Sequence, residues 1–208
     1  MGSLDKRRDL YIIVIPSIGM SLFLIFYGIA AFLYPGGSFS DPTSTNFSFN
    51  NNYLCDLLDS QAINGEINTA STTSRIAFGF LCVTMIFIWY QLPKLFGNIT
   101  FKRQLIRITG ILSMLIALFL ASHIHDVIVY AAGITGFIAY IITFIELYKH
   151  RFFGLLSFGI ISLVLILLNY SIYAYGYWIT ALPIIQKVTF VYAISWFLML
   201  MVATYKRL

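Results

Sequence analysis

Six long apolar runs, separated by short polar or basic segments, dominate the chain. They cover roughly residues 10–34, 75–96, 104–124, 126–148, 152–175 and 180–204. Each run reaches or exceeds the ~20 residues that an α-helix needs to cross the hydrocarbon core of a membrane. Because a helix surrounded by lipid is apolar on every side, run length carries this prediction and an amphipathic period does not. The pattern predicts an all-α integral membrane protein, a six-helix transmembrane bundle forming a single membrane domain, 1–208.

The composition supports this fold class. The chain is 60% hydrophobic and 10% charged, and its mean hydropathy is +0.86, more apolar surface than a soluble domain of this length needs. The first run follows Lys6-Arg7-Arg8 but is longer than the core of a signal peptide, so we expect a retained span. Sequence motifs of nucleotide-binding loops and serine hydrolases are absent.

Basic residues predict the orientation. If the N-terminus is inside, eleven of the thirteen Lys and Arg lie on the inner side, and only Arg75 and Lys187 lie on the outer side. We therefore expect both termini in the cytoplasm and residues 35–74 outside, in the bacterial inner (plasma) membrane. The net charge of +5 then reflects topology and anionic lipid. No basic patch with interleaved aromatics indicates a nucleic-acid partner.

Residues 35–74 form one long outer loop in this topology. The loop opens with the turn sequence Pro35-Gly36-Gly37, and apolar and acidic residues mix over 53–59. Loops of this length in compact proteins are often functional. We expect 53–74 to be ordered over the mouth of the bundle.

Polar residues gather at the outer ends of the predicted spans. Such residues are costly at membrane depth and indicate functional sites. The candidate binding residues are Asp56, Asp59, Glu66, Asn68, Ser71, Ser122, Asn169 and Lys187. We expect Asp56 or Glu66 to pack near the segment that follows the third span.

That segment, Ser122 to Asp126, contains the candidate catalytic residues His123, His125 and Asp126. Imidazole and carboxylate groups are ligands that zinc accepts, and a zinc-bound water is a nucleophile at neutral pH. The same three residues are therefore the candidate metal ligands. The alternative is that both histidines cap helix ends and meet solvent or lipid headgroups.

Lys187 lies about 10 Å inside the last predicted span, at a rise of 1.5 Å per residue. An unpaired ammonium at that depth is costly, so we expect a carboxylate partner, with Asp126 favoured over Asp56 and Glu66. Snorkelling to the interface is the alternative.

Cys55-Asp56, the segment from Glu66 to Ser71, and Ser122, His123 and Asp126 together resemble the motifs of the alkaline ceramidases. The resemblance implies a zinc-dependent amide hydrolase that acts on a lipid. The last span departs from that family, because Gln186 and Lys187 stand where the family carries two histidines. The chain equally resembles small multi-span bacterial membrane proteins with a polar Asp-Leu segment after the first span, a resemblance that assigns no chemistry.

Three functions remain open from the sequence. The first is an outer-leaflet polar site that binds a membrane lipid or amphiphile, without catalysis. The second is a metal-dependent integral-membrane hydrolase of lipid amides or esters. The third is a small proton-coupled transporter, although internal repeats and broken mid-membrane helices are not evident.

Overall fold

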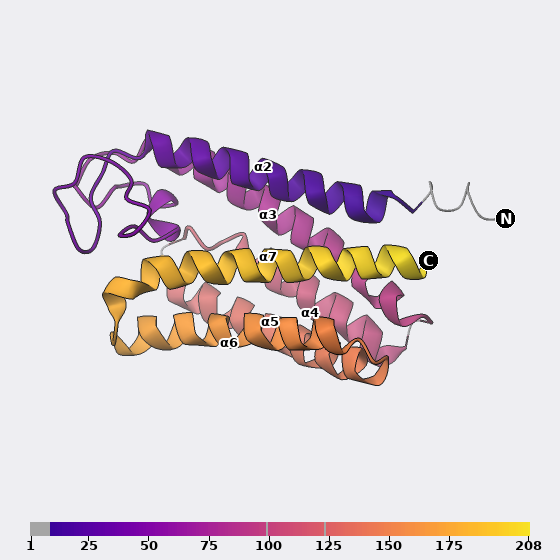
Figure 1. The fold of residues 1–208 in the computed structure, drawn as a ribbon. Coiled ribbons are helices and arrows are strands. Elements are labelled where there is room, and N and C mark those ends of the chain that lie inside the picture. Colours follow the sequence, from indigo (N-terminus) through magenta and orange to yellow (C-terminus); the bar gives the residue numbers. More distant parts are fainter. Residues whose placement is uncertain (1–8, 99, 123) are drawn as a thin grey trace. The chain divides into compact units, whose positions relative to one another are not determined.

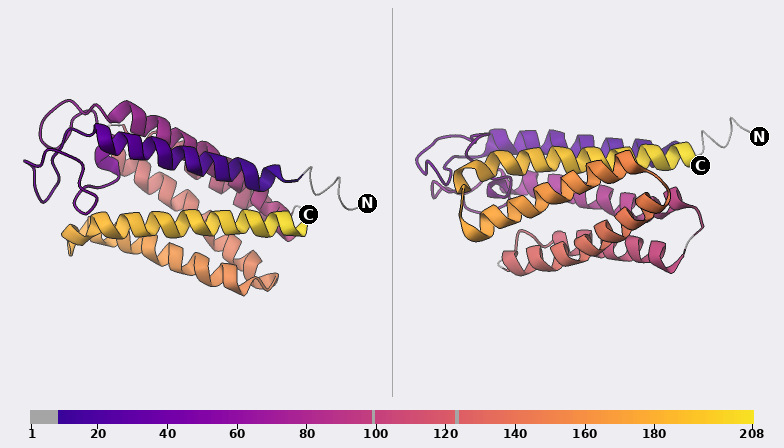
Figure 2. Two further views of the ribbon diagram at one scale, coloured as in Figure 1. Left: turned by 45° about the horizontal axis from the view of Figure 1, so that its top comes forward. Right: turned by 60° about the horizontal axis from the view of Figure 1, so that its bottom comes forward.

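The computed structural model describes residues 9–98, 100–122 and 124–208 (Figures 1 and 2). These residues form six α-helices and three short 3₁₀-helices. The α-helices are α2 (Tyr11–Leu33), α3 (Ser71–Gln91), α4 (Phe101–Ala117), α5 (His125–Lys149), α6 (Phe153–Tyr175) and α7 (Leu182–Arg207). The 3₁₀-helices are η1 (Cys55–Leu57), η2 (Leu92–Phe96) and η3 (Ile179–Ala181).

The predicted apolar runs correspond to these helices. In the described residues, five helices are long and apolar enough to cross a membrane: Tyr11–Leu33, Ser71–Phe96, His125–Lys149, Phe153–Tyr175 and Ile179–Arg207. The prediction of an all-α integral membrane protein is confirmed at this level. Six spans were predicted. The described residues form six α-helices, and five of them have the length and hydropathy of a membrane span.

Helix α4 is the one that differs. It has 17 residues, roughly 26 Å at 1.5 Å per residue, and its first turns carry the basic residues Lys102, Arg103 and Arg107. The predicted run continued to residue 124, but the helix ends at Ala117 and short turns follow it. Its apolar stretch is therefore shorter than the ~20 residues of a usual span.

The residues divide by their internal contacts into two compact units. Unit 1 comprises Met1–Ser21, Phe80–Ile160 and Ile194–Leu208, and unit 2 comprises Leu22–Gly79 and Ile161–Ala193. Helices α2, α3, α6 and α7 contribute residues to both units. That the chain forms a single membrane domain stays a prediction.

An aromatic cluster forms the core of unit 1. The ring of Tyr140 on α5 stacks on Trp196 of α7 at 4.8 Å between centroids, and Phe197 meets the edge of Trp89 at 5.1 Å. Trp196 Nε1 donates to the main-chain oxygen of Leu155 at 2.8 Å. Trp89 and Trp196 are fully buried. The cluster thus joins residues of α3, α5, α6 and α7 within this unit.

Two glycines of unit 1 give a matched test of this packing. A Cβ at Gly110 would lie 2.2 Å from Cδ2 of Trp89, whereas a Cβ at Gly133 would meet nothing within 4 Å. Gly110→Ala should therefore destabilise by about 1–3 kcal/mol through overpacking. Gly133→Ala should stabilise by about 0.5–1 kcal/mol through helix propensity. Melting temperatures in detergent measure both, and equal shifts would contradict the close approach of α4 to Trp89.

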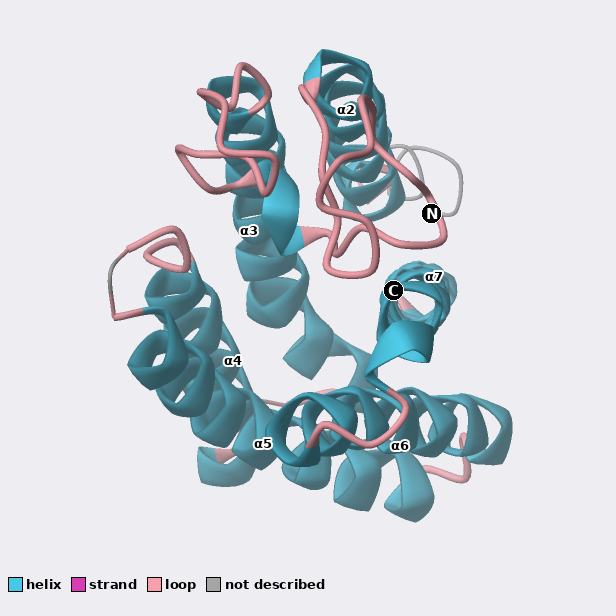
Figure 3. Ribbon diagram, turned by 90° about the vertical axis from the view of Figure 1, so that its left-hand side faces the viewer, coloured by secondary structure: helices cyan, strands magenta, loops and turns pink. Residues whose placement is uncertain are grey.

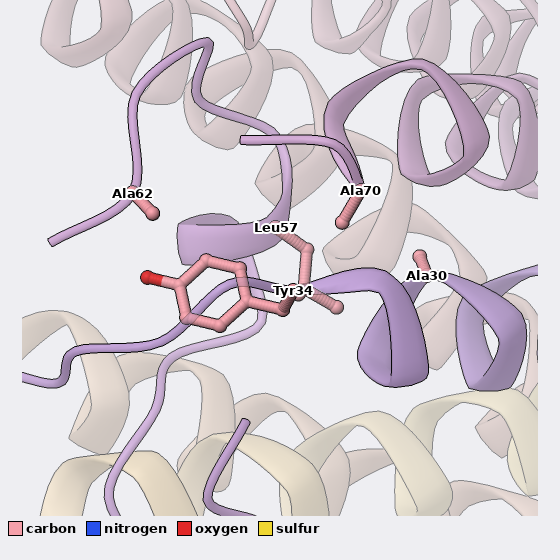
Figure 4. Packing of buried hydrophobic residues seen from close by; sticks show 5 residues of the cluster. All are labelled: Ala30, Tyr34, Leu57, Ala62 and Ala70. Atoms are coloured by element: carbon pink, nitrogen blue, oxygen red, sulfur yellow. The ribbon is translucent and has the colours of Figure 1, made fainter. Parts of the chain in front are cut away.

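Unit 2 contains the segment between α2 and α3, residues 34–70, which we call the α2–α3 loop (Figure 3). Tyr34 is at the centre of its apolar cluster, with Ala30, Leu57, Ala62 and Ala70 around it (Figure 4). The Tyr34 hydroxyl accepts a hydrogen bond from Ile63 N at 3.2 Å. The loop therefore has its own buried core.

Two adjacent glycines allow the loop to close on itself. Gly36 and Gly37 have φ angles of +135° and +84°, which disfavour a side chain. A Cβ at Gly36 would lie 2.1 Å from Ser44 O, and one at Gly37 would lie 2.3 Å from Asn64 N. Gly37 N donates to Ser44 O at 2.7 Å. The predicted turn at Pro35-Gly36-Gly37 therefore packs against two later parts of the loop.

Candidate functional site

Lys187 is the most buried cation of unit 2. Its residue is 7% exposed, and its ammonium donates to Asn52 O at 2.7 Å and to Pro183 O, one turn earlier on α7, at 3.0 Å. The rings of Phe49 and Phe47 lie 4.9 and 5.8 Å from Nζ, centroid to nitrogen. Carbonyl dipoles and aromatic faces both stabilise a cation that has left water.

Asn52 links this cation to a buried carboxylate. Its Nδ2 donates to Asp56 Oδ2 at 2.9 Å and to Gly37 O at 2.7 Å. The same Asp56 oxygen accepts from Tyr53 N at 2.8 Å. Asn52 therefore touches Lys187 with its main chain and Asp56 with its side chain. We call Asn52, Asp56 and Lys187, with Phe47 and Phe49, the Lys187 site.

Burial raises the pKa values of Asp56 and Cys55, two neighbouring residues in the loop. Loss of water raises the pKa of Asp56, and the hydrogen bonds from Asn52 and Tyr53 and the charge of Lys187 only partly oppose this shift. Burial, together with the nearby Asp56 and Asp59, raises the pKa of the Cys55 thiol to about 12. Cys55 is therefore a protonated, unreactive thiol at neutral pH.

The raised pKa of Asp56 predicts a pH dependence of stability. The contribution of Asp56 to the free energy of unfolding is fully present below the pKa of Asp56 in the unfolded chain. This contribution is lost as the pH rises through the raised pKa of Asp56 in the folded protein. The wild type should therefore gain stability relative to Asp56→Asn as the pH falls from 7 towards 4. Melting curves of both proteins across this range measure the difference, and parallel curves would contradict the buried, ionisable Asp56.

Three further hydrogen bonds hold the loop to the helices of unit 2. Gln186 Oε1 on α7 accepts from Leu54 N at 2.8 Å, and the hydroxyl of Tyr27 on α2 donates to Leu54 O. The Tyr53 hydroxyl donates to Ile179 O at 3.4 Å. Both the main-chain N–H and the main-chain oxygen of Leu54 are therefore hydrogen-bonded to helices. These bonds fix the positions of Asn52 and Asp56, which lie two residues before and after Leu54.

Asn68 has a structural role in the same loop. Its Nδ2 lies within 3.3 Å of the main-chain oxygens of Asp56, Leu57 and Asp59, and its Oδ1 accepts from Ala70 N at 3.0 Å. Ser71, the first residue of α3, donates its main-chain N–H to Asn68 O at 3.2 Å. Asn68 therefore fixes η1 against the start of α3.

The other predicted binding residues of unit 2 do not contact Lys187. The side chains of Asp59 and Glu66 are exposed. Asn169 on α6 donates to Leu165 O at 2.9 Å and to the hydroxyl of Thr189 on α7. Of the predicted binding residues in this unit, Asp56 and Lys187 are brought together through Asn52, and Asn68 supports them.

Of the predicted catalytic and metal-binding residues, His125 and Asp126 are described and belong to unit 1. His125 and Asp126 begin α5 with Nδ1 and Oδ1 3.2 Å apart, and their side chains are 41% and 66% exposed. Ser122 is half-buried in the preceding turn, and His123 lies outside the described residues. Within 9–98, 100–122 and 124–208, no three His, Cys, Asp or Glu are grouped to hold a metal ion. The zinc site and the pairing of Lys187 with Asp126 stay predictions.

A charged cluster in unit 1 was not predicted. Arg103 Nε meets Glu146 Oε2 at 2.8 Å, and Arg103 Nη2 lies 3.3 Å from His150 Nε2. His150 Nδ1 lies 2.9 Å from Glu146 O, a pure acceptor, so this nitrogen carries the proton and Nε2 accepts from Arg103. The sequence signal that could have identified the pair is a single Glu within an apolar run, with Arg103 immediately before the preceding predicted span, 104–124.

Comparison with protein-family models, curated proteins and solved structures finds no match to this chain. The resemblance to the alkaline ceramidases therefore depends on the motif residues alone. The function of the Lys187 site is therefore inferred from its own geometry and chemistry.

Proposed function

We propose that this integral membrane protein binds a lipid or another amphiphile at the α2–α3 loop and the start of α7. The main support for this proposal is that unit 2 combines an ordered polar site with exposed apolar side chains. The Lys187 site supplies a buried cation whose surroundings are fixed by main-chain hydrogen bonds. An amphiphile needs a polar contact of this kind beside an apolar surface.

The apolar part is contributed by the same loop. Phe49 is 65% exposed, Ile67 is 82% exposed, and Ile63 is 40% exposed, although the loop around them has a buried core of its own. Exposed apolar groups on an ordered segment indicate contact with a partner or a membrane. A lipid chain, or the headgroup region of the outer leaflet, would cover them.

Photolabelling tests this proposal. The full chain in lipid nanodiscs would be illuminated with a phosphatidylcholine that carries a diazirine in one acyl chain, and the labelled peptides would be mapped. We expect saturable labelling within 45–67, competed by unlabelled lipid and reduced several-fold in Ile67→Ser. Labelling confined to the helices, rising linearly with probe, would reject the function.

We also propose that the α2–α3 loop lies on the outer side of the membrane and the C-terminus on the cytoplasmic side. In an otherwise native chain, Asn46→Cys, which lies exposed in the loop, should react with an impermeant maleimide added to intact cells. Cys55 adds little background because the pKa of its thiol is about 12. Leu208→Cys should react only after lysis. The reverse pattern would put the loop on the cytoplasmic face.

A further inference from the structure

The ammonium of Lys187 has one donor left for a ligand. An ammonium carries three N–H groups, and two of them have carbonyl acceptors, Asn52 O and Pro183 O. The ring of Phe49 lies 4.9 Å from Nζ. A ring face attracts a cation but accepts only weakly, so the third N–H lacks a strong acceptor among these contacts.

The charge of Lys187 is also incompletely matched. In the part of the chain that the structure describes, the ion pairs are Arg103–Glu146 and Lys149–Glu146, His125 contacts Asp126, and Lys187 belongs to none of these pairs. The Asp56 carboxylate acts on it at a distance, with Asn52 between the two groups. Within unit 2, Lys187 is therefore a buried cation without direct contact to an anion, which favours the approach of one.

Phe49 covers this cation from an exposed position. The Phe49 side chain is 65% exposed, whereas Lys187 is 7% exposed. A charge-assisted hydrogen bond to a phosphate or carboxylate is stronger than a cation–π contact with an exposed ring. An anionic group that displaced the ring would gain the third N–H and leave the two carbonyl contacts intact.

We propose that Lys187 binds the anionic headgroup, a phosphate or a carboxylate, of an amphiphile, and that the Phe49 ring covers this position when the ligand is absent. The proposal rests on the proposed function and names its ligand class. The apolar chain of the ligand would lie on the exposed apolar side chains of the same loop, and the displaced Phe49 ring would join them.

A matched pair of probes tests the charge. Palmitic acid with a diazirine in its chain and its methyl ester differ only in the carboxylate, and each would label the purified full chain in neutral detergent. We expect the acid to label 45–54 and 180–190 saturably, and Lys187→Met to reduce that labelling by roughly tenfold while ester labelling stays unchanged. Phe49→Ala, which removes no hydrogen bond, should raise acid labelling several-fold.

Control variants and competitors separate the outcomes. Lys102→Met and Phe101→Ala, at exposed positions of α4, should leave acid labelling unchanged. Dodecyl phosphate should compete with the acid, and inorganic phosphate should not. Equally strong competition by inorganic phosphate would show a free-anion site and overturn the headgroup assignment.

Two results would overturn the inference in distinguishable ways. Saturable labelling of the loop by acid and ester alike, insensitive to Lys187→Met and to Phe49→Ala, would remove the anion preference and leave the proposed function standing. Absence of saturable labelling by both probes would remove the proposed function as well. Because Lys187→Met can disturb folding, its melting temperature is measured first, and Phe49→Ala decides the question if that variant does not fold.

Discussion

Replacing Arg103 by Met should lower the free energy of unfolding by about 3–5 kcal/mol, because the buried carboxylate of Glu146 then keeps only the half-exposed Lys149, 3.7 Å away, as a charged partner. The two side chains are 14% and 5% exposed, and Nε and Oε2 are 2.8 Å apart. The Nη2 contact with His150 at 3.3 Å is lost at the same time. Thermal or SDS-induced unfolding in mixed micelles measures the change.

Lys149→Met is the matched control for this prediction. Lys149 Nζ lies 3.7 Å from the other oxygen of Glu146, but its side chain is 52% exposed. Its removal should cost about 0–1 kcal/mol. The double variant Arg103→Met/Glu146→Gln should recover part of the loss, since it also removes the buried negative charge of Glu146. Equal losses for Arg103 and Lys149 would mean that Glu146 is solvated and the cluster contributes little.

Asn68→Ala should destabilise unit 2 by about 2–4 kcal/mol. The change leaves Ala70 N without its acceptor and removes a donor that faces the main-chain oxygens of Asp56, Leu57 and Asp59. Each buried polar group that loses its partner costs about 1–3 kcal/mol. Because η1 contains Asp56, the Lys187 site should loosen as well, which amide hydrogen exchange over 50–60 would report.

Asn51→Ala provides the comparison, since Asn51 is exposed in the same loop. A surface change of this kind stays within about 0.5 kcal/mol. If Asn68→Ala behaved like Asn51→Ala in both melting and exchange, the buried role of Asn68 would be wrong.

The positions of the helices could be predicted from the sequence because length and hydropathy decide them. Each predicted run matches a helix to within a few residues, except at the end of α4. There the residues after Ala117 remain apolar, but turn hydrogen bonds such as Leu120 N to Ala117 O replace the helical ones. Hydropathy does not distinguish an apolar turn from an apolar helix.

The contacts of the candidate site were less predictable, although Asp56, Asn68 and Lys187 were identified. The sequence suggested a carboxylate for Lys187, whereas its hydrogen bonds go to the main-chain oxygens of Asn52 and Pro183. Every residue has such an oxygen, so main-chain acceptors leave no signal in a sequence. Asn52 lies in a run of three asparagines that reads as an ordinary polar loop, and only the fold distinguishes the buried one.

Native mass spectrometry of the full chain directly tests whether the α2–α3 loop binds an amphiphile. The protein would be released from neutral detergent micelles with palmitic acid added, and the bound mass followed as collision energy increases. We expect one adduct that survives after annular detergent is stripped and that is lost at lower energy in Lys187→Met and in Ile67→Ser. A broad, statistical series of adducts, stripped together with the detergent and identical in the variants, would contradict it.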